Sequence, residues 1–79
     1  MESAQQSANN VMSNCQYNIT KQLEKKLQFL WHVDGYIQDA EREGNGECAK
    51  LFRQIKADEE RHANALKELL AIGGQRPPK

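Results

Sequence analysis

The sequence has little of what stabilises a very small protein on its own. Its two cysteines, Cys15 and Cys48, are too few for a disulfide scaffold. No C-x-x-C pair is present, so a zinc ribbon or a thioredoxin-type redox motif is not expected either. A chain of 79 residues buries a smaller share of its surface than a larger domain does. Metal binding and oligomerisation therefore remain as the possible supports.

Charge of one sign and long apolar runs are also missing. Eleven Lys and Arg residues balance eleven Asp and Glu residues, so neither nucleic acid nor an anionic membrane is expected as a partner. No stretch approaches 18 consecutive apolar residues, and the first residues lack the basic and apolar regions of a signal peptide. These absences predict a cytoplasmic protein that does not cross a membrane.

Proline and glycine are scarce before the end of the chain, which favours long helices. Both prolines lie at positions 77 and 78, and Gly44-Asn45-Gly46 is the main interruption before them. Apolar residues recur every three and four positions on both sides of this interruption. We predict a helix over 14–43, a turn over 44–46 and a helix over 47–72. A polar segment, 1–13, is flexible or extends the first helix, and the tail 73–79 is flexible.

The turn carries the expected capping residues. Gly44 stands where a left-handed helix end would fall, Asn45 or Gly46 can cap the next helix, and Glu47 places a negative charge in its first turn. Two long helices joined by such a short turn must run antiparallel. The predicted fold is an all-α helical hairpin with one uncovered apolar face. We therefore expect a homodimer that forms a four-helix bundle, with larger assemblies as an alternative.

The second helix carries two polar residues on its apolar stripe. The stripe is Cys48, Leu51, Phe52, Ile55, Leu66, Leu69 and Leu70, and its spacing is continuous only if Glu59 and His62 also face the core. A buried carboxylate must be paired, protonated or bound to a metal. Because Glu59 and His62 are three residues apart, both can reach the same ion, and their donor atoms suit iron, manganese or zinc. Alternatively, Glu59 lies at the edge of the stripe, and Asp58 or a backbone group satisfies His62.

These motifs resemble those of the rubrerythrin branch of the ferritin-like superfamily. The resemblance covers residues 27–70 and consists of Tyr36…Ala40…Glu43-Gly44, Ala49-x-x-Phe52-x-x-Ile55 and Glu59-x-x-His62. The half-length form is also similar to encapsulated ferritins, which implies an iron site completed between two hairpins. The resemblance implies that Glu59 is a bridging carboxylate ligand and His62 a terminal nitrogen ligand. It further implies a ferroxidase or peroxidase type of oxidoreductase with a di-iron centre.

The first helix departs from this family pattern. The family places a glutamate there, opposite the Glu-x-x-His turn, but residues equally distant from the turn are Trp31 and Gln28. The nearest alternative ligands are Asp34 and His32. Asp34 could instead cap a local bend or pair with a lysine of the other helix, and His32 could be an interface or surface residue.

Other side chains have simpler interpretations. Aromatic residues such as Trp31, Phe29 and Tyr36 are expected to pack in the dimer interface, although Tyr36 could also be a hydrogen-bond or redox partner of a metal. Basic residues are expected on outward, solvated faces: Lys21, Lys25, Lys26, Lys50, Arg53 and Lys56.

Three functions fit the sequence. The first is a ferritin-like metalloprotein whose iron reacts with oxygen or peroxide. The second is a structural or protein-interaction hairpin in which Glu59 and His62 form a polar network. The third is a zinc or iron carrier without turnover.

Overall fold

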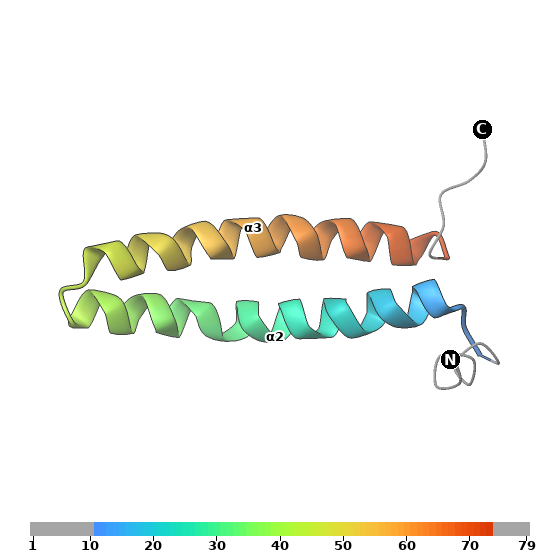
Figure 1. Ribbon diagram of the computed structural model, residues 1–79, viewed down its shortest axis with the longest axis horizontal. Coiled ribbons are helices and arrows are strands. Elements are labelled where there is room, and N and C mark those ends of the chain that lie inside the picture. Colours follow the sequence, from blue (N-terminus) through green and yellow to red (C-terminus); the bar gives the residue numbers. More distant parts are fainter. Residues whose placement is uncertain (1–10, 74–79) are drawn as a thin grey trace.

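Two helices packed against each other make up most of the described part of the chain. The computed structural model describes residues 11–73, and within this range there are two helices and no strand. Helix α2 spans Asn14–Arg42 and helix α3 spans Gly46–Ala71, and the two run side by side in opposite directions (Figure 1). The prediction of an all-helical hairpin is confirmed, whereas the four-helix bundle stays a prediction. The polar segment 1–13 and the tail 73–79 lie largely outside the described residues.

Helix α2 begins at a capping box that fixes its first turn. The Ser13 hydroxyl accepts a hydrogen bond from the backbone N–H of Gln16 at 3.0 Å, and the Gln16 side chain accepts one from the backbone N–H of Ser13 at 2.9 Å. Both contacts satisfy backbone donors that a helix start leaves unpaired. Among the described residues, the helix therefore begins just after Ser13.

The turn between the helices uses the residues that the sequence places there. Gly44 has a φ of 72°, a left-handed conformation that L side chains disfavour. The backbone N–H of Asn45 donates to the carbonyl of Ala40 at 2.8 Å, which closes the end of α2. The Asn45 side chain then accepts from the backbone N–H of Cys48 at 3.0 Å and caps α3. This tight connection explains why the helices are antiparallel neighbours.

The two helices meet along a narrow line, which we call the seam. Its completely or almost completely buried residues are small or β-branched: Ile19, Val33, Ala40, Ala49 and Ala63. Half-buried residues such as Leu23, Leu30 and Phe52 fill the positions between them, so the seam repeats every seven residues, as in an antiparallel coiled coil. The largest side chain that is fully buried is only that of Val33. Most large apolar side chains of the described chain thus retain contact with solvent.

One side of the hairpin, next to the seam, is apolar on both helices. This apolar face consists of Phe29, Tyr36, Cys48, Leu51, Ile55 and Leu69, and His62 lies within it. Residues seven positions apart lie on the same side of a helix. In an antiparallel pair, the residues that immediately precede a seam residue in the sequence lie on the same side of the hairpin in both helices. The rings confirm this placement, because Tyr36 contacts both Phe29, at 6.2 Å between centroids, and Phe52, at 5.5 Å. Leu51, predicted within the buried stripe, is 55% exposed in the single chain.

The opposite side of the hairpin carries ion pairs between the helices. Lys56 of α3 donates to Asp34 of α2 at 2.8 Å, and Arg53 pairs with Glu41 nearer the turn. Trp31 and Leu27 project on this side of α2 and are 84% and 53% exposed. Neither described helix is long and apolar enough to cross a bilayer.

Candidate functional site

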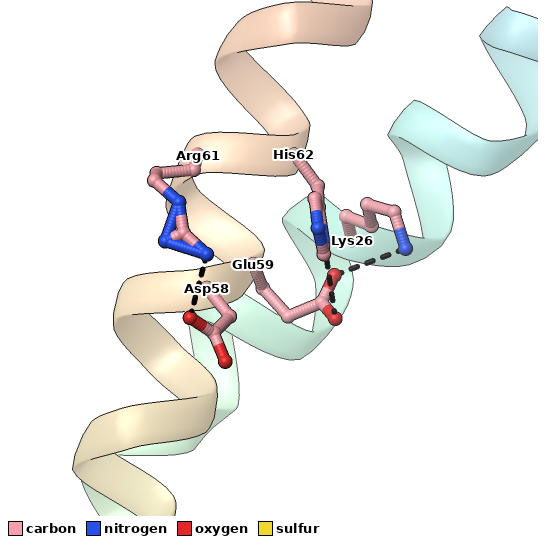
Figure 2. Close-up of polar contacts among 5 residues, drawn as sticks. All are labelled: Lys26, Asp58, Glu59, Arg61 and His62. Atoms are coloured by element: carbon pink, nitrogen blue, oxygen red, sulfur yellow. Dashed lines mark hydrogen bonds and ion pairs between the residues drawn. The ribbon is translucent and has the colours of Figure 1, made fainter.

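Glu59 and His62 come together with Lys26 midway along the hairpin. Lys26 Nζ lies 3.0 Å from Glu59 Oε1, and His62 Nδ1 lies 3.7 Å from Glu59 Oε2. Figure 2 shows Glu59 and His62 on α3 and the Lys26 side chain reaching Glu59 from α2. The side chains of Lys26 and Glu59 are 25% and 24% exposed, whereas that of His62 is 55% exposed. Helical spacing explains the group, because residues 59 and 62 are one turn apart on α3.

The ammonium of Lys26 decides the charge state of this group. Its contact lowers the pKa of Glu59 below the ordinary value of 4.5, while burial acts in the opposite direction and His62 adds a smaller lowering. Oε1 of Glu59 is shielded from solvent, and the Lys26 contact is an ion pair without the alignment of a hydrogen bond. Glu59 is therefore an ionised, half-buried carboxylate.

The prediction that Lys26 points outward is wrong. Lys26 occupies the position between Leu23 and Leu30 in the three-and-four spacing of the seam, where its long side chain lies over the other helix. Lys26 lies more than one turn before the residue of α2 that is as far from the turn as Glu59 is, and its long side chain carries the ammonium to Glu59. A signal for this was present in the sequence, since the spacing Ile19, Leu23, Leu30, Val33 leaves position 26 on the seam.

Trp31 and Gln28, at the levels of Glu59 and His62 along the hairpin, do not meet these residues through their side chains. Both are exposed on α2, and Trp31, at 84%, is the most exposed of the large apolar side chains in the two helices. The rise per residue sets the level of a residue but not the direction in which its side chain points. The side chain that contacts Glu59 from α2 is that of Lys26 instead.

The two alternative first-helix ligands are not brought to this group. Asp34 is equally distant from the turn as Lys56 and pairs with it, which raises the pKa of Lys56 through the hydrogen bond and the charge of Asp34. This contact confirms the interpretation of Asp34 as a partner of a lysine on the other helix. Lys56, expected on an outward face, is consequently half-buried beside the seam. His32 is exposed on α2.

Asp58 does not satisfy His62. Its carboxylate accepts a hydrogen bond from Arg61 at 2.8 Å, and Figure 2 shows this pair on the side of α3 away from Lys26. Within the described residues, the imidazole of His62 contacts the carboxylate of Glu59. His62 is thus an exposed member of the group, and Glu59 links it to Lys26.

One hairpin supplies two donors of the types that bind iron, manganese or zinc. Among residues 11–73, no group of three or more His, Cys, Asp or Glu side chains lies close enough together to hold a metal ion. The carboxylate of Glu59 and the imidazole of His62 are donor types that such ions take.

Comparison with protein-family models, with curated proteins and with solved structures gives no match. The resemblance to the ferritin-like superfamily therefore stays a prediction from the motifs.

Proposed function

We propose that this chain is a self-associating helical hairpin that serves as half of a homodimeric four-helix bundle, a structural or protein-interaction module. The observation that carries the proposal is the apolar face. Tyr36 and Leu51 are 41% and 55% exposed, and Phe29, Ile55 and Leu69 are only half-buried. These side chains come from both helices and lie on one side of the hairpin.

The energetics of a small chain support this proposal. Completing the burial of a Leu, Ile or Phe side chain contributes up to about 1.5–3 kcal/mol, and the apolar face offers several that are partly exposed. Small residues dominate the buried seam, so the contact between the two helices removes little large apolar surface from water. The apolar face of a second copy would cover this face and remove its apolar side chains from water, as in other antiparallel bundles.

The distribution of charge supports the same side for the contact. The ion pairs Asp34–Lys56 and Glu41–Arg53 line the opposite side of the hairpin, where they remain in solvent. Desolvating such pairs is unfavourable, and depletion of charged residues is typical of interface cores. The apolar face is therefore the better contact surface.

Sedimentation equilibrium of matched variants tests the proposal. The wild-type chain should be a dimer at tens of micromolar, and Leu51→Glu should weaken dimerisation at least tenfold by placing a carboxylate in the interface. Trp31→Glu, on the opposite side, is the control and should leave the dimer intact. Circular dichroism checks that both variants stay helical. A folded wild-type monomer at this concentration would overturn the proposal, as would dissociation by Trp31→Glu alone.

A second candidate function is metal binding in the manner of ferritin-like proteins. It is favoured by Glu59 and His62, which lie 3.7 Å apart beside the apolar face, so that a dimer formed there has two carboxylates and two imidazoles to offer. Iron is the first candidate, with manganese or zinc as alternatives. A bound iron would supply redox chemistry with oxygen or peroxide as the oxidant, as in a ferroxidase or peroxidase. Lys26 contacts Oε1 of Glu59, whereas Oε2 lies on the side of His62, where an ion would bind.

Metal analysis separates this function from the structural one. Protein purified without chelator should contain at least one iron, manganese or zinc ion per dimer, and Glu59→Ala with His62→Ala should abolish binding. The control is Asp58→Ala with Arg61→Ala, which changes residues at the same spacing on the other side of α3. Oxygen or peroxide consumption on adding ferrous ion distinguishes an enzyme from a zinc or iron carrier. Metal-free protein whose melting temperature is unchanged by added iron would exclude this candidate.

A further inference from the structure

Lys26 and His62 contact different oxygens of one carboxylate. Lys26 Nζ lies 3.0 Å from Oε1 of Glu59, and His62 Nδ1 lies 3.7 Å from Oε2, as Figure 2 shows. We infer that Lys26 acts as a resident cation on Glu59, so that the metal site takes a single divalent ion per chain, on the side of Oε2 and His62. This inference rests on the metal binding proposed above as the second candidate function, and it adds the stoichiometry and the residue that limits the affinity.

The Oε1 side of the carboxylate already has its cation. Oε1 of Glu59 is shielded from solvent, and the Lys26 side chain that reaches it is 25% exposed. Lys26 lies on the seam between the half-buried residues Leu23 and Leu30, so its methylene stem runs along apolar neighbours. An ion at Oε1 would displace the ammonium and leave it half-buried without a counter-charge, which is unfavourable.

The Oε2 side of the carboxylate is open to an ion. The His62 side chain is 55% exposed, and its Nδ1 is too far from Oε2 of Glu59 for a hydrogen bond. A neutral imidazole and the carboxylate therefore both keep lone pairs that an ion can use. Because no group of three or more His, Cys, Asp or Glu side chains lies together within residues 11–73, we expect one hairpin to bind such an ion weakly.

The charge of Lys26 opposes metal binding even where the ammonium does not occupy the position of the ion. The single negative charge of Glu59 cannot balance both an ammonium and a divalent ion, and two like charges that share one carboxylate repel each other. Removing the charge of Lys26 should therefore strengthen metal binding. The loss of a residue that only holds Glu59 in place would have the opposite effect.

Isothermal titration calorimetry with Mn²⁺ alone tests this role in the full chain. Mn²⁺ is the probe because it prefers oxygen and nitrogen donors to the thiols of Cys15 and Cys48. Wild type should bind one ion per chain. Lys26→Gln should bind the same number about tenfold more tightly, because the charge is removed while the new amide can still donate to Glu59.

Arg53→Gln is the matched control. It removes an equal charge from the ion pair with Glu41, which lies nearer the turn, and should change the affinity for Mn²⁺ less than about twofold because solvent and salt screen the longer distance. Circular dichroism checks that both variants stay helical. If Lys26→Gln does not fold, the number of ions bound by wild type tests the inference without any substitution.

The outcomes separate this inference from the function beneath it. Two ions per chain in wild type, or an affinity that Lys26→Gln leaves unchanged or weakens, would overturn the role of Lys26 and leave metal binding standing. No binding of Mn²⁺ by wild type or by Lys26→Gln would overturn both.

Discussion

Lys26 and Glu59 occupy positions of the seam that apolar residues fill elsewhere. Their side chains are about one-quarter exposed, so the pair is intermediate between a solvent-exposed salt bridge and a fully buried one. The spacing of the second helix was sufficient to predict Glu59 at this position. The charge of Lys26 favours an outward side chain, whereas its spacing favours the seam, and the structure follows the spacing.

Removing one partner of this pair should destabilise the hairpin, while replacing both should not. In Lys26→Met the carboxylate of Glu59 loses its cation but stays half-buried, so we expect a loss of about 1–2 kcal/mol in the free energy of unfolding. Lys26→Leu with Glu59→Leu should be neutral or stabilising, because apolar side chains suit the seam. Urea denaturation at neutral pH measures both effects.

The exposed Asp58–Arg61 pair is the matched control for this experiment. Its side chains are 56% and 67% exposed on the same helix. Arg61→Met should change the free energy of unfolding by less than about 0.5 kcal/mol. If Arg61→Met costs as much as Lys26→Met, the partial burial of the Lys26–Glu59 pair has no special effect.

Acid should weaken the hairpin through Glu59. The pKa of Glu59 is lower in the folded chain than its ordinary value of 4.5, mainly because of the Lys26 contact. The unfolded chain therefore binds the proton more tightly, and the stabilisation is fully present above pH 4.5 and is lost as the pH falls through the folded pKa. Urea titrations from pH 6 to pH 2.5 should show a shallower loss for Glu59→Gln than for wild type. Equal slopes would show that other carboxylates account for the acid effect.

The helices show which local features a sequence can specify. Gly44 and Asn45 were expected to end one helix and cap the next, and the structure has the left-handed glycine and the capping amide at these residues. The start of α2 was harder to place, because apolar spacing continues weakly before it, while the capping box of Ser13 and Gln16 sets the boundary. Capping residues therefore indicate where a helix begins and ends better than the apolar pattern does.

Two glycines should respond in opposite ways to alanine substitution. Gly35 lies inside α2 with open space around its Cβ position, so Gly35→Ala should stabilise the hairpin by about 0.5–1 kcal/mol through helix propensity. Gly44 also has open space, but its φ of 72° penalises any L side chain, so Gly44→Ala should destabilise it by about 1 kcal/mol. Thermal unfolding of the two variants measures this difference. Stabilisation by Gly44→Ala would show that the turn readily adopts another conformation.

At the scale of the whole molecule, the sequence predicted the order and length of the elements better than their mutual rotation. Asp34 and Lys56 meet because both are equally distant from the turn, as helical rise requires. Trp31 is also at the level of Glu59, yet it is 84% exposed because the seam passes through Leu30 and Val33 instead. Successive residues of a helix point about 100° apart, so the level of a residue along the hairpin does not by itself specify its contacts.

The thermal stability of the hairpin should depend on protein concentration. If the apolar face is buried against a second copy, unfolding also dissociates the dimer, and each tenfold dilution reduces the stability of the dimer by about 1.4 kcal/mol. For a dimer of this size we expect the melting temperature to fall by about 4–6 °C per tenfold dilution. Leu51→Glu should have a lower melting temperature that is independent of concentration, because its unfolding involves one chain. A constant melting temperature for wild type between 1 and 100 μM would mean that the exposed side chains of the apolar face need no partner.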